Sequence, residues 1–378
     1  KSFNNNKIVV VLSAMSGVTN QLQSYIDEIG YKPSKETDLV LTSGEQVTIG
    51  LLSMILNKEG IKSMPLLGWQ IPIITDDSHE KGSILNIDDK NINQYFKNCD
   101  VIVLAGFQGV NCKGEITSLG RGGSDTSAVA IAAAIKADRC DIYTDVEGVF
   151  TTDPNIEKSA QKIDKLTYEE MLEMSSTGAK VLQTRSVELA MKNNLTLQVL
   201  SSLTGKEGTY IINENKLIEK EIVSGVSFSK NESKVTISGI PDKPGISAKI
   251  FSLMSKHNIN VDMIVQNISQ DGINANLTFT VPTNDLNFSK KLLEENQNQI
   301  GYRDISTDKE VAKVSVIGMG MMSQTGVAEK MFKTLADNRI NILAISTSEI
   351  KISVLISRNF IKEAVRSLHS AYSLGLNK

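Results

Sequence analysis

The sequence has few of the residues that build disulfide frameworks, zinc sites or histidine-based active sites. Its 378 residues include only three cysteines and three histidines, all scattered and without a C-x-x-C pair. An odd number of isolated cysteines argues against disulfides and structural zinc and favours reduced thiols in the cytoplasm. We therefore expect carboxylates, lysines and backbone amides to carry any chemistry.

A strong charge bias and long apolar runs are also lacking. The 40 lysines and arginines nearly balance the 43 aspartates and glutamates, whereas nucleic-acid-binding domains usually carry a basic excess. No uninterrupted apolar run approaches the roughly 20 residues of a membrane span, and residues 1–6 lack the apolar core of a signal peptide. With 40% hydrophobic residues, the composition indicates two or three packed domains that bind neither nucleic acid nor membrane.

The first half alternates apolar strands with helices. Ile8–Leu12 and Val101–Ala105 are continuous apolar runs that end in small or polar residues, and Cys140–Thr144 reads as a further strand. Residues 125–137 are alanine-rich and apolar nearly all round, which predicts a buried helix. This alternation predicts an α/β domain over residues 1–221, with a mostly parallel sheet covered by helices on both faces.

The second half contains an internal repeat. Four features recur 81 positions later (326 against 245): Gly245-Ile246, Phe251, Ile259 and Asn260 are matched by Gly326-Val327, Phe332, Ile340 and Asn341. Four matches at one offset indicate a duplication. Each copy reads as strand, glycine turn, helix, two strands and helix, which predicts two small α+β domains over residues 222–304 and 305–378.

The segment GRGGSD, residues 120–125, is the most informative stretch for function. Its glycines allow backbone N–H groups to approach an anion, and the N-terminus of the following helix adds partial positive charge. Arg121 can bind a carboxylate or phosphate through two parallel hydrogen bonds, and Asp125 can face a reacting centre. The alternative is a simple turn in which Ser124 or Asp125 caps the helix. We favour the functional interpretation because the four residue types occur together.

Two further stretches can contribute to such a site. Residues 143–154 place polar groups at the end of a strand, where ligands bind in parallel sheets, although a hydrogen-bonded turn explains them as well. Lys180, beside glycine and alanine, can reach a phosphate or can simply be solvated. Neither a Walker loop nor the protein-kinase motif set occurs, so any phosphate chemistry follows another plan.

Six motifs occur in the order typical of aspartokinases, and the chain resembles that family over nearly its whole length. They are SAMSGVTN (13–20), TSGEQ (42–46), GFQG (106–109), LGRGGSDTSA (119–128), TDVEGVFTTDP (144–154) and GAKVL (178–182). The resemblance implies the amino-acid kinase fold followed by two βαββαβ ACT domains. In this family the last strand of the chain can complete the first ACT domain, so the boundary at 304 is approximate.

The resemblance also implies the roles of individual residues. Asp125 and Lys180 match catalytic positions, with Asp125 near the transferred phosphoryl group and Lys180 on the phosphates. The substrate-binding positions are Ser13, Thr19, Glu45, Arg121, Gly122, Gly123 and Ser124. The ATP-binding positions are Thr144, Asp145, Phe150, Asp153, Asn155, Lys180 and Val181. Magnesium would arrive with ATP, and no dedicated metal site is assigned.

The implied reaction is ATP-dependent phosphorylation of the 4-carboxylate of L-aspartate, the first step towards lysine, threonine and methionine. Lysine or threonine would act as feedback effectors, and the enzyme would form a homodimer through its ACT domains, or a tetramer. The effector-binding positions are Asp242, Gly245, Ser247, Gln266, Asn341 and Ile342.

Some features depart from the family pattern. The family's Lys-Phe-Gly-Gly strand does not occur in these residues, Gln183-Thr184 replaces His-Pro, and Phe150 and Asn155 replace tyrosine and arginine. Two alternatives remain: a kinase for another carboxylate, such as N-acetylglutamate, and a non-catalytic amino-acid sensor.

Overall fold

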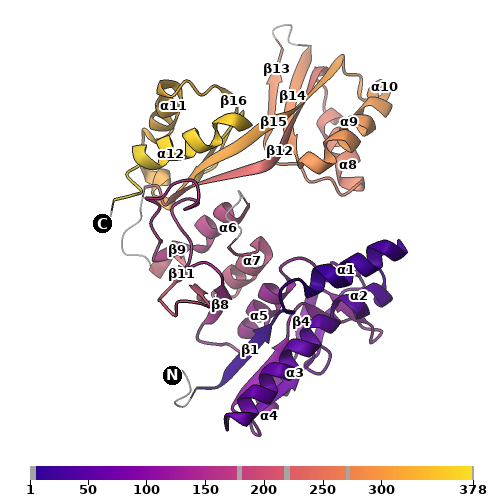
Figure 1. The fold of residues 1–378 in the computed structure, drawn as a ribbon. Coiled ribbons are helices and arrows are strands. Elements are labelled where there is room, and N and C mark those ends of the chain that lie inside the picture. Colours follow the sequence, from indigo (N-terminus) through magenta and orange to yellow (C-terminus); the bar gives the residue numbers. More distant parts are fainter. Residues whose placement is uncertain (1–5, 177–180, 217–221, 270–272, 377–378) are drawn as a thin grey trace. The chain divides into compact units, whose positions relative to one another are not determined.

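The computed structural model describes residues 6–176, 181–216, 222–269 and 273–376, without the side chains of residues 89–91, 322 and 323. The chain forms two compact units. The first consists of Lys1–Glu147 and Lys180–Lys216, and the second of Gly148–Ala179 and Leu217–Lys378. Figure 1 labels their helices and strands.

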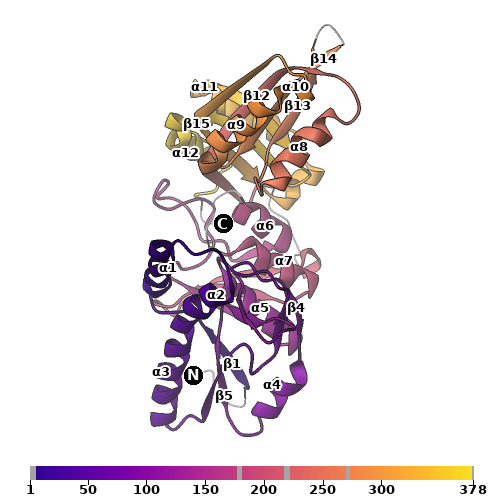
Figure 2. The ribbon, with the colours of Figure 1, turned by 90° about the vertical axis from the view of Figure 1, so that its right-hand side faces the viewer.

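The centre of the first unit is a parallel sheet of β1 (Ile8–Leu12), β5 (Val101–Ala105) and β2 (Ser63–Leu66), with β5 in the middle. Side chains alternate along β5 between two hydrophobic clusters, because successive residues of a strand point to opposite faces. One cluster includes Ile49 of α3 (Ser43–Lys58), and the other includes Ile131 of α5 (Gly123–Ala134) and Ile92 of α4 (Asp89–Tyr95). Figure 2 shows α3 and α4 on opposite sides of the sheet.

Two further sheets contribute strands to the first unit. In one, β10 (Leu197–Ser201) pairs in parallel with β8 (Cys140–Thr144) and antiparallel with β11 (Thr209–Ile212). The other has the strand order β4 (Ile84–Ile87), β3 (Ile73–Thr75), β6 (Gln108–Val110) and β7 (Ile116–Ser118). The remaining helices are α1 (Val18–Ile29), α2 (Lys35–Leu41) and α7 (Thr184–Lys192).

One stretch of the described residues, Lys35–Lys58, is long and apolar enough to cross a membrane by length and composition alone. The search for uninterrupted apolar runs did not find it, because the mean hydropathy of a helix can be high even when polar residues interrupt the apolar ones. It is weak evidence for a span, since core helices pass the same test. The stretch comprises α2 and α3, which meet at Thr42, and it contains the buried carboxylates of Asp38 and Glu45.

The second unit contains an antiparallel six-stranded sheet in the order β13 (Ile264–Ile268), β14 (Asn274–Val281), β12 (Gly225–Pro241), β15 (Asp304–Ile317), β17 (Lys351–Ser357) and β16 (Ile342–Thr347). Helices α8 (Ile246–Lys256), α9 (Leu286–Glu295) and α10 (Gln297–Ile300) pack on its first half. Helices α11 (Val327–Asp337) and α12 (Ile361–Ala371) pack on its second half. The two halves are the duplicated modules that the repeat predicts.

The modules exchange strand segments, which differs from the sequential boundaries expected at residues 222 and 304. Residues 225–229 of β12 pair with residues 313–317 of β15, and Val226 belongs to the core of the second module. Residues 304–308 of β15 pair with residues 234–238 of β12, and Ile305 packs on the core of the first module. The last described strand, β17, pairs with β15 and β16, so the first residues of β15, rather than the last strand, complete the first module.

The second unit also contains residues 148–176, which the sequence reading assigned to the catalytic domain with the rest of residues 1–221. This segment includes β9 (Lys165–Thr167) and α6 (Tyr168–Ser176). Ile156 contributes its side chain to the core of the second module. Hydrophobic pattern does not reveal such an assignment, because an apolar side chain does not specify which core it joins.

Candidate active site

The segment GRGGSD forms the turn that opens α5. Gly122 is the N-cap of the helix, with φ 69°, and no side chain caps it, so the alternative in which Ser124 or Asp125 serves as the cap is wrong. A Cβ on Gly122 would lie 1.8 Å from Cγ of Gln183, and a Cβ on Gly106 would lie 2.9 Å from Cβ of Ser124. Glycine is therefore required for close packing at both positions, and the uncapped helix N-terminus can receive an anion.

Phe107, which lies against the start of α5, has a strained backbone conformation. Its φ of 67° lies in the left-handed region, which bulky residues rarely adopt. Its N–H donates to Oγ of Ser127, and its carbonyl accepts from the N–H of Leu119. Backbone strain of this kind is concentrated at functional sites, where surrounding contacts maintain it.

The ends of two parallel strands meet at this place. The N–H of Gly106, after β5, donates to the carbonyl of Leu12 at the end of β1. A Cβ on Gly44, in the first turn of α3, would lie 2.7 Å from Cβ of Ala14. Residues after β1, residues after β5 and the N-termini of α3 and α5 therefore adjoin one another, at the strand ends where α/β sheets bind ligands.

Glu45 is the buried carboxylate of this region, with 2% of the residue exposed. Its Oε1 accepts a hydrogen bond of 3.0 Å from the N–H of Ala14, and its Oε2 has no hydrogen-bond partner. Burial raises the pKa of the Glu45 carboxyl. A buried carboxylate oxygen without a partner is costly, so a cationic ligand would relieve the cost.

Asp125, expected to be catalytic, and the remaining expected substrate-binding residues lie on α5, in the turn before it, after β1 and on α1. Asp125 is in the first turn of α5, and burial raises the pKa of its carboxyl to about 6. Arg121 is exposed in the turn before α5, and Ser124 is half-buried beside Gly106. Ser13 is exposed at the end of β1, and Thr19 is half-buried in the first turn of α1.

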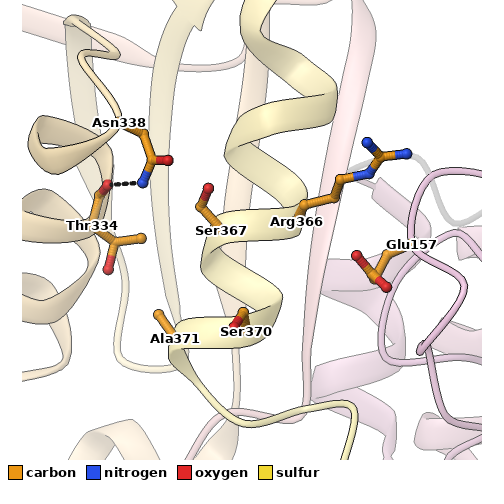
Figure 3. A pocket seen from close by; sticks show the side chains of 7 residues that line it. All are labelled: Glu157, Thr334, Asn338, Arg366, Ser367, Ser370 and Ala371. Carbon is orange, nitrogen blue, oxygen red and sulfur yellow. Dashed lines mark hydrogen bonds between the residues drawn. The ribbon is translucent and has the colours of Figure 1, made fainter.

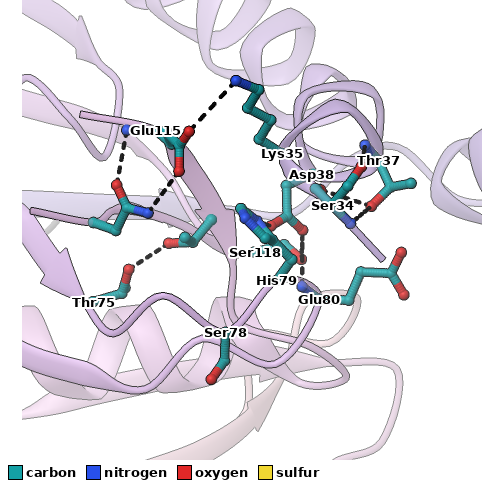
Figure 4. Close-up of polar contacts among 12 residues, drawn as sticks. Ser34, Lys35, Thr37, Asp38, Thr75, Ser78, His79, Glu80, Glu115 and Ser118 are labelled. Carbon is teal, nitrogen blue, oxygen red and sulfur yellow. Dashed lines mark hydrogen bonds and ion pairs between the residues drawn. The ribbon is translucent and has the colours of Figure 1, made fainter. Parts of the chain in front are cut away.

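A polar cluster around the buried Asp38 was not predicted from the sequence (Figure 4). Asp38 of α2 is fully buried, and its carboxylate accepts hydrogen bonds from Oγ of Ser118 at 2.6 Å and from the N–H of Glu80 at 3.0 Å. Nδ1 of His79 lies 2.7 Å from the same carboxylate. Ser118 ends β7 immediately before the turn, so Asp38 ties α2 and the loop around His79 to it. A single acid in the stretch TDLVLT is a weak signal, because its partners are distant in sequence.

Arg185 of α7 completes this support. One terminal guanidinium nitrogen donates to the carbonyl of Leu119 at 3.1 Å, and the other donates to the carbonyl of Gly82 at 2.8 Å. The N–H of Gly82 in turn donates to the carbonyl of Ser118. The segment that leads into the glycine turn is thus held by the Arg185 side chain of α7 and by the backbone of the loop before β4.

Comparison with known proteins identifies the family. The amino acid kinase family model matches residues 1–201, and an ACT domain model matches residues 235–297 and 314–372. The chain is 50% identical over 371 residues to an aspartate kinase of Pseudomonas fluorescens, covering 97% of this chain and 90% of that protein. The chain belongs to the aspartokinase family. An aspartokinase of Helicobacter pylori is 46% identical over 374 residues, covering 98% of this chain and 92% of that protein.

Solved structures agree with this assignment. Escherichia coli aspartokinase III in complex with aspartate and ADP matches with a TM-score of 0.80 at 24% identity, covering 96% of this chain and 92% of that chain. The same enzyme in complex with lysine and aspartate matches with a TM-score of 0.75 at 25% identity, covering 97% of this chain and 93% of that chain. The fold is that of an amino-acid kinase followed by two ACT domains, and the chain is an aspartate kinase.

The positions expected to bind ATP are divided between the two units. In the first unit, Thr144 ends β8 and its hydroxyl donates to Asp145 at 3.1 Å, while Val181 is half-buried. In the second unit, Oδ1 of Asp153 accepts from the N–H of Asn155 at 2.8 Å and from its side-chain amide at 3.0 Å. This local turn explains why the segment ends in TTDPN.

Phe150 and Lys180 are the two remaining positions that were expected to bind ATP. Phe150 is half-buried and forms an isolated antiparallel bridge with Lys162. Lys180, the expected phosphate-binding lysine, lies outside the described residues.

The expected effector positions of the first ACT domain gather at the start of α8. Gly245 is the N-cap of α8, with φ 95°, and Asp242 is exposed before it. Oγ of Ser247 donates to Oε1 of Gln266 on β13 at 2.9 Å, so two of the residues chosen by resemblance contact each other directly. Asn341 is exposed and Ile342 begins β16 in the second ACT domain.

Proposed function

We propose that this enzyme transfers the γ-phosphoryl group of ATP to the 4-carboxylate of L-aspartate. The observation that carries the proposal is the partnerless, buried Oε2 of Glu45 beside the end of β1. A substrate ammonium group would supply the missing hydrogen bond and the opposite charge. The uncapped N-terminus of α5 offers N–H groups, and Arg121 a guanidinium, to the α-carboxylate of the same amino acid.

The substrate provides its own nucleophile. An oxygen of the ionised 4-carboxylate attacks the γ-phosphorus, the bond to the β–γ bridging oxygen breaks, and ADP leaves with the electron pair. No strong base is needed, so the enzyme acts mainly through positioning and charge stabilisation. In this scheme Ser13, Thr19 and the backbone of residues 122–124 orient the substrate, and Asp125 lies near the transferred group.

ATP binds at Thr144, Asp145, Phe150, Asp153, Asn155 and Val181 in this proposal, with Lys180 on the phosphates. Magnesium usually binds through one or two carboxylates together with phosphate oxygens and water. The carboxylate of Asp125 fits this donor chemistry, and no group of three or more acidic, histidine or cysteine side chains forms a metal cage among the described residues. Bound with ATP, magnesium would neutralise part of the phosphate charge.

The ACT domains suggest regulation by amino acids. The Escherichia coli enzyme was solved with lysine bound, which supports lysine as an effector here, with threonine as the other candidate. We propose Asp242, Gly245, Ser247, Gln266, Asn341 and Ile342 as effector contacts, in a cytoplasmic homodimer or tetramer that initiates lysine, threonine and methionine synthesis. Calorimetry with lysine and with threonine tests this regulation, which is rejected if neither binds.

The activity test uses the full-length gene product with ATP, magnesium and either L-aspartate, L-glutamate or N-acetyl-L-glutamate. We expect ADP release with L-aspartate, and trapping with hydroxylamine should give the aspartyl hydroxamate, because the product is an acyl phosphate. Release of ADP with another carboxylate alone would assign a different substrate. Absence of ADP with all three would reject a kinase function under these conditions.

A further inference from the structure

Helix α12, the last helix of the second ACT domain, holds both ends of residues 151–156. Nε2 of His369 lies 2.8 Å from the hydroxyl oxygen of Thr151. Nε of Arg366 donates a 2.9 Å hydrogen bond to the carbonyl of Ile156. Because residues three apart lie on one face of a helix, both contacts come from the same side of α12. We call His369 and Arg366 the α12 clamp.

The ends of the clamped segment are buried in the regulatory module. His369 is 1% exposed, and the N–H of Val226 on β12 donates to the carbonyl of Thr151 at 2.7 Å. The side chain of Ile156 lies in the core of the second ACT domain. The anchors of this segment are therefore regulatory-domain groups on α12, on β12 and in the core between them.

The middle of the segment is exposed and locally ordered. Pro154 and Asn155 are exposed, whereas Asp153 is half-buried and binds the backbone and side-chain amides of Asn155. Buried ends and an exposed, pre-shaped middle are the arrangement expected of a binding turn held by a scaffold. Asp153 and Asn155 are proposed ATP contacts, so the inference below rests on the proposed function.

Helix α6 is attached to the regulatory sheet as well. Glu170 of α6 accepts hydrogen bonds from Oγ of Ser224 and from the N–H of Met319, which flank β12 and β15. Glu173 of α6 forms a 2.6 Å ion pair with Lys351 of β17. These contacts are independent of α12, and they attach α6 to the same ACT sheet.

We propose that the second ACT domain supports the ATP site directly, with His369 and Arg366 as positioning residues that set the affinity for nucleotide. Figure 3 shows Arg366 extending from α12 towards the segment that carries Glu157. An open groove of about 520 Å³ lies beside this contact and is lined by Glu157, Thr334, Asn338, Arg366, Ser367, Ser370 and Ala371. Arg366 is an exposed residue at this groove, so replacing it removes the contact without opening a cavity in the core.

The first experiment compares Arg366→Gln with Lys362→Gln. Both changes remove one positive charge from an exposed position of α12, but only Arg366 contacts the carbonyl of Ile156. We expect Arg366→Gln to raise the dissociation constant of ADP and the KM for ATP about three- to tenfold, with the KM for aspartate unchanged within twofold. Lys362→Gln should change neither. Equal increases of both KM values, or no change, would overturn the proposal.

The second experiment compares His369→Gln with His369→Asn. A glutamine amide reaches about as far as Nε2 of histidine and can retain the bond to Thr151, whereas an asparagine amide reaches only as far as Nδ1. We expect ADP affinity close to wild type for His369→Gln and weaker affinity for His369→Asn, at similar melting temperatures. If the buried His369→Asn variant does not fold, the exposed Arg366→Gln variant decides the question.

Asp153→Ala separates failure of this inference from failure of the proposed function. If Asp153→Ala weakens ADP binding while the clamp variants do not, the clamp is structural only and the ATP assignment stands. If neither Asp153→Ala nor the clamp variants weaken ADP binding, the assignment of residues 151–155 to the ATP site is wrong, and the clamp proposal is wrong with it.

Discussion

Glu45 and Glu170 are both buried, but they differ in how many hydrogen bonds the surrounding protein donates to them. Glu45, in the first unit, is 2% exposed, and Glu170, in the second, is 3% exposed. Glu170 accepts four hydrogen bonds: from the N–H and hydroxyl of Thr167, the hydroxyl of Ser224 and the N–H of Met319. Glu45 accepts one, from Ala14, and leaves Oε2 without a partner.

The difference shows how a structural carboxylate can be told from a ligand-binding one. Burial alone does not distinguish them, because both are equally shielded from water. The number of hydrogen bonds does distinguish them. The protein donates hydrogen bonds to both oxygens of Glu170, whereas Oε2 of Glu45 has no donor, at the edge where two parallel strands end. The following predictions test this contrast.

Glu170→Gln should have the largest effect, and it should be on stability. The amide group would face donors on one side of the former carboxylate, so the variant should lower the free energy of unfolding by about 2–4 kcal/mol. Urea denaturation measures this change. The KM for aspartate of the folded variant should stay within about twofold, and a large rise in it would place Glu170 in substrate binding instead.

Glu45→Gln should show the opposite pattern. Loss of the charge facing the substrate ammonium should lower kcat/KM for aspartate about 10- to 100-fold, while the free energy of unfolding stays the same or rises. The reason is that no protein partner of Oε2 is lost. Steady-state kinetics and urea denaturation on one preparation provide both values. A loss of stability as large as that of Glu170→Gln would contradict the distinction between a structural and a ligand-binding carboxylate.

The effect of Asp38→Asn on substrate binding should lie between the effects of Glu170→Gln and Glu45→Gln. Its carboxylate is satisfied, as that of Glu170 is, but it supports the turn that carries Arg121 and Ser124. We expect the KM for aspartate to rise about three- to tenfold and the KM for ATP to change less. Glu36→Gln, at an exposed position of the same helix, is the control. A change confined to the KM for ATP would show that the cluster supports something other than the glycine turn.

Asp125→Asn should stabilise the fold, and the gain in stability should depend on pH. The folded pKa of about 6 lies above the ordinary aspartate value of 3.8, so ionising Asp125 costs stability as pH rises between these values. The variant should gain stability relative to wild type between pH 4 and pH 6, and keep that gain at higher pH. Urea denaturation at pH 4.5 and 7.5 measures it. A gain in stability that is the same at both pH values would show that the pKa of Asp125 does not lie between them.

Much of the molecule could be predicted from local sequence. The glycine turn before a buried helix, the alternating strands and the repeat are short-range patterns, and they predicted the fold class and the two modules. Glu45 and residues 121–125 were chosen by motif, and the structure puts Glu45, Ser124 and Asp125 on elements that meet at one edge. The effector residues Ser247 and Gln266 were chosen in the same way and are in contact.

Other features depend on contacts between distant residues. Asp38 meets Ser118 across 80 positions, and Thr151 meets His369 across 218. Nothing near these residues in sequence indicates the partner, since a buried acid or a helical histidine is compatible with many neighbours. The exchange between β12 and β15 escaped prediction for a similar reason, because a long strand does not reveal which module each of its halves will join.

The chemical groups, the family and the order of the elements thus follow from the amino-acid sequence, because they depend on residue types and short spacings. Tertiary packing sets which buried carboxylate has all its hydrogen bonds, as Glu170 does, and which one has an oxygen without a partner, as Glu45 does. It also determines that residues 151–156 are held by the second ACT domain. Both outcomes depend on which backbone and side-chain donors are brought within about 3 Å of an acceptor, and packing rather than local pattern sets that distance.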